Sequence, residues 1–398
     1  MSLVDRNVTV LGGGIGGLAA ALALAGRGAR VRLLEQADAF AEVGAGLQIT
    51  PNGSAVLAGL GLAAELSAIG MQLQAVELRD YRRPEPLLRL EMTRSRHGNP
   101  HPYLLVHRAD LIDMLANAAR LRGVDLCLGH KVCDIRVLAD ECRLTLEQGK
   151  QEHAEILVAA DGLHSLGRGV LGHAGKPRFT GQVAWRSTVP SRLVGGQNAP
   201  EAKVYMGPKR HLVTYPLRRG ELVNVIAVAE RQEWAAEGWS HQVDSTDMRR
   251  SFSSWAPEVG RLLMVAEVVH LWGLFQHPVA ECWANGRLVL LGDACHPTLP
   301  FMAQGANMAL EDGWVLAAML AREDRPEAAF QTYHAARVHR VKRIVARSTG
   351  NTGIYHMSAL PARGAMHMGM RLLNRIAADQ MLARFDWLYG HDVTAIYP

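Results

Sequence analysis

The 398-residue chain has few cysteines, little net charge and no long apolar run. Its cysteines are Cys127, Cys133, Cys142, Cys282 and Cys295, an odd number with no Cys-x-x-Cys pair. A disulfide framework and a zinc site are therefore not expected, and the composition fits a reducing, cytoplasmic setting without a bound metal ion.

The charge balance excludes another class of protein. With 43 basic and 38 acidic residues, the net charge of +5 is too small for this length to predict nucleic-acid binding. The most apolar N-terminal stretch, residues 8–25, is interrupted by glycines and lacks the roughly 20 unbroken apolar residues of a membrane span. We expect no stable association with a membrane.

The first 35 residues have the pattern of a strand, a glycine turn, a helix and a second strand. Residues 7–11 are apolar and β-branched, residues 15–27 are rich in alanine and leucine, and residues 29–35 form another strand pattern. This βαβ unit predicts two parallel, buried strands.

Further along, the pattern alternates between helices and strands and then changes. Residues 75–105 indicate irregular or edge-strand structure, and residues 108–121 a helix. From about 178 to 275, alternating segments predict an antiparallel sheet with one covered face. Short strands are predicted at 124–128 and 143–146, and buried strands at 155–160 and 286–291. Helices are predicted at about 303–321 and 325–349.

The glycine turn carries the motif Gly12-x-Gly14-x-x-Gly17 between a strand and a helix. Glycines there allow a tight turn and let backbone amides approach a pyrophosphate at the positive end of the helix. Glu35 ends the second strand, where a carboxylate can bind ribose hydroxyls. A packing turn is the alternative, but the complete βαβ context favours a dinucleotide, either NAD or FAD.

Two further acidic motifs follow predicted buried strands. Asp161-Gly162 follows the strand at 155–160, and Gly292-Asp293 follows the strand at 286–291. A carboxylate at a strand end can hold ribityl hydroxyls, and the next helix presents free amides to an electron-rich ring edge.

With these three motifs in this order, the sequence resembles the class A flavoprotein monooxygenases, which are single-component, FAD-dependent aromatic hydroxylases. The likeness extends to about residue 350 and is strongest to the branch of salicylate hydroxylase, 3-hydroxybenzoate 6-hydroxylase and 6-hydroxynicotinate 3-monooxygenase. Residues 44–49 and 51–52 match the second flavin-facing segment of the family, and residues 107–111 match its arginine step beside the FAD phosphates.

The resemblance implies an α/β fold like that of p-hydroxybenzoate hydroxylase. A Rossmann-like FAD-binding domain (1–75, 102–177 and 278–330) would be interleaved with an antiparallel β-sheet substrate domain (76–101 and 178–277). A C-terminal helical segment (331–398) would follow, packing on its own chain or forming a contact between copies, so the protein would be a monomer or a homodimer.

The resemblance also implies bound FAD, transient NADH or NADPH, and O2 as co-substrate. No second Gly-x-Gly-x-x-Gly motif with a following acidic residue is present, so no separate NAD(P)H domain is expected. The implied cofactor-binding residues are Gly12, Gly14 and Gly17 at the pyrophosphate, Glu35 at the adenosine ribose, Arg108 beside the phosphates, Gly46 facing the flavin, Asp161 and Gly162 in mid-chain, Asp293 at the ribityl chain, and Gly305 and Ala306 at the pyrimidine edge.

A histidine and a tyrosine four positions apart characterise the substrate sheet of this branch, and here they are His211 and Tyr215. Positions i, i+2 and i+4 share one face of a strand, so Val213 points the same way. His211 would accept a phenolic proton, and Tyr215 would orient the ring or a carboxylate. The alternative is a surface histidine and a core tyrosine. Gln48, Pro300, Phe301 and Met302 are the other expected pocket residues, and Arg186 either attracts a substrate anion or forms a structural ion pair.

Two other features have ordinary interpretations. Arg337, Arg340, Lys342, Arg343 and Arg347 form a basic stripe that predicts a solvated helix face. The neighbouring Cys295 and His296 suggest a metal or catalytic pair, but the flavin motif explains them better.

The expected function is therefore hydroxylation of a small aromatic, phenolic or carboxylated substrate through a flavin C4a-hydroperoxide. One alternative is a flavin enzyme of the same fold that acts on a non-phenolic or polycyclic substrate. Two others are an NAD-dependent dehydrogenase that uses the first βαβ unit alone, and an FAD-binding protein without catalysis.

Overall fold

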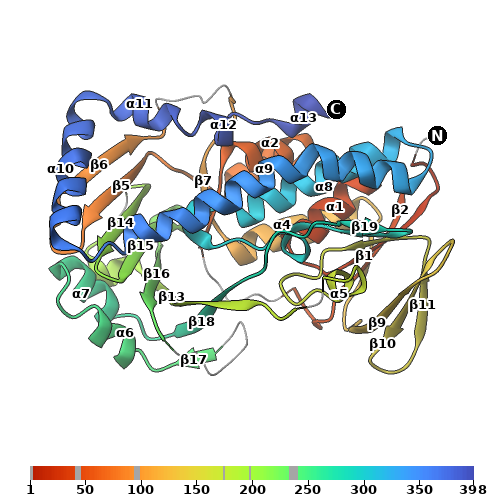
Figure 1. Cartoon of the computed structure of the whole chain (residues 1–398), viewed down its shortest axis with the longest axis horizontal. Helices are drawn as coiled ribbons and strands as arrows, with labels where there is room; N and C mark the ends of the chain where they lie inside the picture. The colour runs from red at the N-terminus through yellow and green to blue at the C-terminus, as the bar shows by residue number, and fades with distance from the viewer. Residues whose placement is uncertain (1–2, 41–45, 94–98, 174, 197–198, 233–240) are drawn as a thin grey trace.

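A computed structural model describes the chain except for residues 1–2, 41–45, 94–98, 174, 197–198 and 233–240. Figure 1 shows an elongated molecule in which the long helix α9 (Pro326–Tyr355) runs across the body. No helix among the described residues is both long and apolar enough to cross a membrane.

A six-stranded sheet forms the first layer, in the order β19-β20-β12-β1-β2-β8. Its pairs are parallel except for β19 with β20, as the pattern of the first 35 residues predicts for β1 and β2. The strands are β1 (Asn7–Leu11), β2 (Arg30–Leu34), β8 (Asp125–Cys127), β12 (Ile156–Ala159), β19 (Ala284–Asn285) and β20 (Leu288–Leu290).

Three helices pack together in the same part of the molecule: α1 (Ile15–Ala25) contacts both α4 (Arg108–Leu121) and α8 (Gly305–Arg322). The α1–α8 contact is close because glycine lies in it. A Cβ on Gly313 would lie 2.9 Å from the backbone nitrogen of Ala20. This packing fixes the start of α8 relative to the glycine turn that begins α1.

Two further sheets in the described part of the chain have three strands each. One lies at the end of the molecule near β1 (Figure 1) and contains β9 (Val132–Val137), β10 (Cys142–Leu146) and β11 (Gln151–Ala154). The other contains β3 (Gly46–Ile49), β7 (Leu104–His107) and β4 (Met71–Gln72). The helices α2 (Pro51–Gly59) and α3 (Ala63–Ile69) lie between β3 and β4 in the chain.

An eight-stranded sheet forms the second large layer, in the order β17-β18-β13-β16-β15-β14-β5-β6. It is antiparallel except where β14 pairs with β5 in parallel, so the predicted antiparallel sheet is in fact mixed. The strands are β5 (Ala75–Asp80), β6 (Pro86–Glu91), β13 (Arg178–Pro190), β14 (Glu201–Gly207), β15 (Arg210–Leu217), β16 (Leu222–Glu230), β17 (His241–Val243) and β18 (Val269–Gln276).

Both faces of this sheet are buried, so the prediction of one covered face is wrong. On one face Trp185, Leu212 and Val225 join a hydrophobic core with residues of α6 (Thr246–Ser251) and α7 (Pro257–Met264). On the other face His211 and Tyr215 are only 1% and 3% exposed. The alternation predicts two distinct faces correctly, but it cannot tell a solvated face from one that a distant segment covers.

The C-terminal part packs on its own chain. After α9, helix α10 (Leu360–Ile376) lies against β6, and α11 (Ala378–Ala383), α12 (Asp386–Tyr389) and α13 (Val393–Ile396) return along the top of the molecule in Figure 1. The indole nitrogen of Trp314 donates a 2.8 Å hydrogen bond to the carbonyl of Tyr397. The exact domain boundaries given above stay predictions.

Candidate functional site

The three acidic and glycine motifs meet at one edge of the parallel sheet. Neighbouring strands β20, β12, β1 and β2 run in the same direction and end together. Asp293, Asp161, Gly12 and Glu35 each follow the end of one of these strands or stand just beyond it. In an open α/β sheet, ligands bind at the carboxyl ends of the strands.

The glycine turn leaves room for a ligand where side chains would fill it. Gly12 has a φ of +105°, and a Cβ there would lie 2.5 Å from the carbonyl oxygen of Ala160. A Cβ on Gly17 would lie 1.9 Å from the carbonyl oxygen of Gly12. A Cβ on Gly14, in contrast, would meet no atom within 4 Å. The turn thus packs tightly against its own sheet at Gly12 and against itself at Gly17, whereas there is open space beside Gly14 at the start of α1.

The carboxylates at this edge have different surroundings. Glu35 accepts a hydrogen bond of 2.6 Å from the backbone nitrogen of Gly13. Asp161 accepts hydrogen bonds from the amides of Leu166 and Gly167, which begin the short helix α5 (Leu166–Val170), and burial raises its pKa. Its other carboxylate oxygen is buried without a partner among the described residues. Gly162, with a φ of +75°, has open space beside it.

Asp293 is half-buried in the 3₁₀ turn (Gly292–Ala294) after β20. Burial raises its pKa, while the nearby positive charges of His296 and Arg108 act in the opposite direction. Arg108 begins α4, which starts directly after β7. The structure therefore brings together two predicted FAD contacts that are 185 positions apart in the sequence.

Gly46 joins the small β3 sheet to the eight-stranded sheet. Its backbone nitrogen donates a 2.8 Å hydrogen bond to Oδ1 of Asn224 on β16. A Cβ at Gly46 would lie 2.5 Å from the Tyr215 ring. The amide nitrogen of Asn224 is buried and has no hydrogen-bond partner within the part of the chain that is described. Gly44 and Ala45, from the same predicted flavin-facing segment, lie outside the described residues.

His211 is a buried histidine, which excludes the surface alternative. Its ring packs edge-on against Phe301 with 5.1 Å between ring centroids, and it lies at the same distance from Tyr355. Nδ1 of His211 lies 2.7 Å from Nε2 of His356. Burial, with a smaller contribution from His356, holds the pKa of His211 well below its usual range, so the ring is neutral at pH 7.

Tyr215 lies further along the same strand face, beside the second flavin-facing segment. Burial raises its pKa, whereas the positive charge of Arg186 and a hydrogen bond with Gln48 act to lower it. Gln48 also accepts a 2.6 Å hydrogen bond from the hydroxyl of Tyr103. The phenol of Tyr215 is therefore protonated at neutral pH and suited to donating a hydrogen bond.

The remaining predicted pocket residues are placed as follows. Val213 is half-buried on the face shared by His211 and Tyr215. Phe301 and Met302 lie in a 3₁₀ turn with Pro300, which is exposed. Gly305 and Ala306, both half-buried, begin α8 directly after this turn. Of these predicted pocket residues, Pro300 is poorly suited to lining a pocket because it is exposed.

A buried ionic cluster connects α8 to α9. Arg337 contacts Glu311 at 2.6 Å and Asp312 at 2.7 Å, with all three side chains at most 1% exposed. Arg340 contacts Glu311 at 2.8 Å. The prediction that the arginines of α9 form a solvated face is therefore wrong for these two, because their acidic partners lie on another helix. Arg343 and Arg347 are exposed as predicted.

The cluster also explains the Cys295–His296 pair. Nε2 of His296 lies 2.5 Å from Asp312, and Cys295, His296 and Asp312 have the geometry of a possible metal ligand set. However, Asp312 already pairs with Arg337, and burial raises the pKa of the Cys295 thiol. A guanidinium beside the carboxylate and a protonated thiol are unfavourable for a cation.

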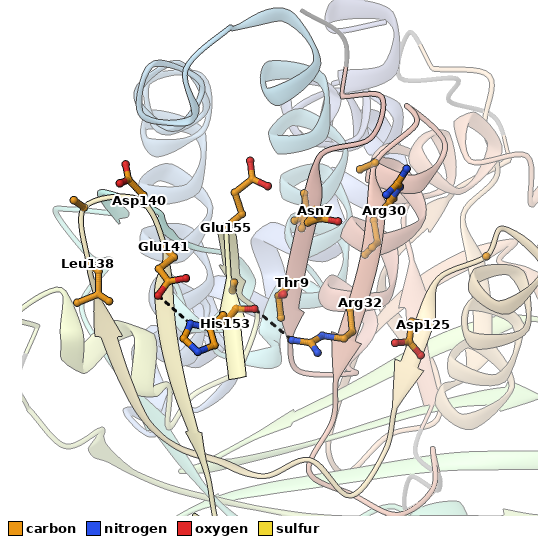
Figure 2. Close-up of a pocket in the computed structure, with 16 residues that line it drawn as sticks. Asn7, Thr9, Arg30, Arg32, Asp125, Leu138, Asp140, Glu141, His153 and Glu155 are labelled. Carbon is orange, nitrogen blue, oxygen red and sulfur yellow. Dashed lines mark hydrogen bonds and ion pairs between the residues drawn. The ribbon is translucent and has the colours of Figure 1, made fainter. Parts of the chain in front are cut away.

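A surface cleft of about 960 Å³ lies elsewhere, between the start of β1 and the β9–β11 sheet. Figure 2 shows charged side chains along it, including Arg32 on β2 and His153 beside Glu141. His153 and Glu141 are 2.9 Å apart, and Arg32 pairs with Glu152 at 2.7 Å. None of the predicted site residues lines this cleft. It is a polar cleft between two sheets, away from the glycine turn.

Comparison with known proteins agrees with the geometry of the strand edge. A family model described as an FAD binding domain matches residues 5–348. The chain belongs to the FAD-dependent aromatic monooxygenases.

Relatives of this family cover nearly the whole chain. 3-Amino-4-hydroxybenzoate 2-monooxygenase PtnB3 of Streptomyces platensis is 34% identical over 98% of this chain and 97% of its own. 6-Hydroxynicotinate 3-monooxygenase of Bordetella bronchiseptica is 34% identical over 87% of this chain and 91% of its own. The solved structure of Klebsiella pneumoniae HpxO with FAD and uric acid has a TM-score of 0.83 and 26% identity, covering 95% of this chain and 97% of that one.

This monooxygenase uses FAD, NAD(P)H and O2, and its fold is that of p-hydroxybenzoate hydroxylase-like proteins. Its residues fit FAD on structural grounds: an open glycine turn, an unpartnered oxygen of Asp161 and the half-buried Asp293 at one sheet edge. Sequence reasoning missed Asn224, His356 and Glu230. None of the three belongs to a motif. Asn224 and Glu230 lie near the site because β16 pairs with β15, and His356 because α9 ends there, so the hydropathy pattern could not indicate them.

Proposed function

We propose that this monooxygenase hydroxylates a small aromatic acid that carries a ring hydroxyl, with His211 as the base. The observation that carries the proposal is the position of His211. It is a neutral, buried histidine on the sheet face that also presents Tyr215, and Tyr215 contacts the second flavin-facing segment at Gly46. A base in this position would be shielded from water.

The cofactor roles in this proposal follow the motifs. Gly12, Gly14 and Gly17 would hold the pyrophosphate, Glu35 the adenosine ribose, and Arg108 the phosphates. Asp293 would hold the ribityl chain, and the amides of Gly305 and Ala306 would face the flavin pyrimidine. Bound FAD, reduced by NAD(P)H, supplies activated oxygen for attack by the ring.

The protein side chains supply the base, the orientation and a dry site. His211 would accept the proton of the substrate hydroxyl, which increases the electron density of the ring. Tyr215 would donate a hydrogen bond that fixes the ring. Phe301, which packs on the His211 ring, would exclude water from this position.

Arg186 is the cation suited to a substrate carboxylate. It lies on β13, in register with Ile226 of β16, which in turn pairs with Val213. Its guanidinium stacks on the ring of Trp272 at 4.5 Å and influences the pKa of Tyr215. The substrate would therefore have its carboxylate toward Arg186 and its hydroxyl toward His211.

The test is substrate-stimulated turnover. Purified protein is mixed with NADH or NADPH and with 3-hydroxybenzoate, 3-amino-4-hydroxybenzoate or salicylate, and oxygen uptake and product are measured. The proposal predicts that at least one acid accelerates NAD(P)H oxidation and yields a ring-hydroxylated product. Acceleration by none of them, with uric acid active instead, would favour a non-phenolic substrate.

That second candidate has one specific observation in its favour: the HpxO structure, which is similar to this chain over 95% of its length, contains uric acid. Uric acid has no phenolic hydroxyl, so its oxidation would need no base that deprotonates a phenol. The buried His211 is better explained by a substrate whose ring carries a hydroxyl.

We also propose that the protein works in a reducing, cytoplasmic compartment, because all five cysteines are free thiols.

A further inference from the structure

Three side chains from distant parts of the sequence form one hydrogen-bonded chain that begins at His211. Nδ1 of His211 lies 2.7 Å from Nε2 of His356, and Nδ1 of His356 lies 3.0 Å from Oε1 of Glu230. His211 belongs to β15, His356 follows the last residue of α9, and Glu230 ends β16. The end of α9 thus completes a contact that the sheet alone does not contain.

The chain runs from the interior to the solvent. His211 is 1% exposed, the side chain of His356 is 3% exposed, and that of Glu230 is 40% exposed. His356 is held in place by its backbone, because its carbonyl accepts hydrogen bonds from the amide of Lys209 and the hydroxyl of Ser358. A proton that reaches Glu230 can therefore pass to water.

The hydrogen-bond partners determine which nitrogens carry protons. A carboxylate only accepts, so Nδ1 of His356 must donate to Glu230. A neutral His356 then has a bare Nε2, which accepts from Nδ1 of His211. Nε2 of His211 is consequently unprotonated and, within the described residues, makes no hydrogen bond. The chain presents a bare nitrogen at the inner end, as a base requires.

We propose that His356 and Glu230 form a proton exit for His211 during substrate deprotonation. This inference rests on the proposed function. The substrate O–H bond breaks and a bond from hydrogen to Nε2 of His211 forms. The Nδ1 proton of His211 moves to Nε2 of His356, and the Nδ1 proton of His356 moves to Glu230, which releases it to water. No redox change accompanies the transfer, and both imidazoles end neutral as the opposite tautomers.

The surroundings of His356 favour passing the proton on over keeping His356 protonated. The groups that face His356 are His211 and Arg210 from β15, Glu230 from β16, and the neighbouring Tyr355 from α9. Burial lowers the pKa of His356, the cation of Arg210 lowers it further, and Glu230 acts in the opposite direction. Burial raises the pKa of Tyr355 to about 12, so this phenol does not compete for the proton.

The experiment measures proton release from the holoenzyme in weak buffer containing phenol red. Stopped-flow mixing uses whichever of 3-hydroxybenzoate, 3-amino-4-hydroxybenzoate and salicylate stimulates NAD(P)H oxidation most. His356→Gln keeps both hydrogen bonds, because its amide oxygen can accept from His211 and its amide nitrogen can donate to Glu230, but an amide cannot relay a proton. We expect release and hydroxylation to slow at least about tenfold, with substrate affinity and the flavin spectrum unchanged.

Two further variants make the result specific. Glu230→Gln removes the terminal acceptor at a partly exposed position, where folding is not at risk, and should slow release, while Glu230→Asp should restore most of it. His367→Gln is the matched control, because His367 is another buried histidine beside a carboxylate, 3.2 Å from Asp80, that does not contact His211.

Wild-type rates of proton release in both His356→Gln and Glu230→Gln would overturn the proton exit while leaving His211 as the base. An equal loss in His367→Gln would overturn it as well, since a general structural effect would then explain the result. If the wild-type enzyme itself hydroxylates none of the acids, the proposed function fails and the proton exit fails with it.

Discussion

At the scale of single residues, burial sets the chemistry of the site. A histidine on an exposed strand would titrate near its ordinary pKa of about 6.5. His211 is buried against Phe301 and Tyr355, which lowers its pKa and keeps it neutral. The sequence placed His211 and Tyr215 on one strand face, but whether that face is wet or dry depends on residues 301 and 355, far along the chain.

Replacing His211 tests its role directly. His211→Ala should lower the rate of hydroxylation by roughly 10²–10⁴-fold, the range for loss of a general base. The flavin spectrum should stay unchanged, because no predicted FAD contact is removed. The measurement is single-turnover product formation with the stimulating aromatic acid. An unaltered rate would remove His211 from the mechanism.

The low pKa of His211 also predicts a pH profile. Only the unprotonated ring can accept a proton, and its pKa lies well below the usual value. Activity should therefore not decline through protonation of His211 as the pH falls from 8 to about 6.5, and the acid limb should lie below that ordinary value. The kcat/KM of the wild-type enzyme across this range is the measurement, and an acid limb centred near 7 would contradict the assigned environment.

At the scale of elements, the sequence predicted those helices and strands that depend on local sequence patterns. The parallel β1 and β2 and the helix α4 from Arg108 to Leu121 occur as expected, because buried runs and helical periodicity are local signals. The mixed pairing of β5 with β14 was missed, since strand direction depends on connections more than 100 residues long. The buried arginines of α9 were missed for the same reason: their partners are on α8.

A substitution in the glycine turn should weaken cofactor binding without affecting folding. Gly14 has an extended conformation and open space where a Cβ would be, so Gly14→Ala should fold normally. The added methyl would occupy the space proposed for the pyrophosphate. We expect FAD affinity to fall at least about tenfold, equivalent to about 1.4 kcal/mol, in a flavin fluorescence titration of the apoprotein.

Gly350→Ala is the control for this substitution, because Gly350 is an exposed glycine of α9 with no atom within 4 Å of an added Cβ. It should bind FAD like the wild type. Unchanged FAD affinity in Gly14→Ala would mean that the open side of the turn does not face the cofactor.

The ionic cluster between α8 and α9 predicts a stability effect. Arg337→Met leaves the carboxylates of Glu311 and Asp312 buried with one cation fewer. We expect the free energy of unfolding to fall by about 3–5 kcal/mol, as when one partner of a buried pair is removed. Urea denaturation monitored by circular dichroism measures it. Arg347→Met, at an exposed position of the same helix, should change little, and an equal loss in both would show that the cluster is not the cause.

At the scale of the whole molecule, the site exists because segments far apart in the sequence interlock. The β3 segment binds β16 through Gly46 and Asn224, and the end of α9 reaches β15 through His356. The motifs at Gly12, Asp161 and Asp293 lie far apart in the sequence, but each follows a strand of the same parallel sheet, so the pattern predicted that they meet at the proposed cofactor edge. The substrate side has no such rule, so its identity rests on the chemistry of His211, Tyr215 and Arg186.

The protein is an FAD enzyme that hydroxylates a small aromatic substrate, and we propose that this substrate is a hydroxylated aromatic acid. The most direct measurement is the visible spectrum of the purified protein, followed in the same cuvette by NADH and a panel of hydroxylated aromatic acids. We expect a bound flavin spectrum, faster NADH oxidation with one acid and a ring-hydroxylated product. Bound flavin that responds to none of the acids, with either NADH or NADPH, would show that a hydroxylated aromatic acid is not the substrate.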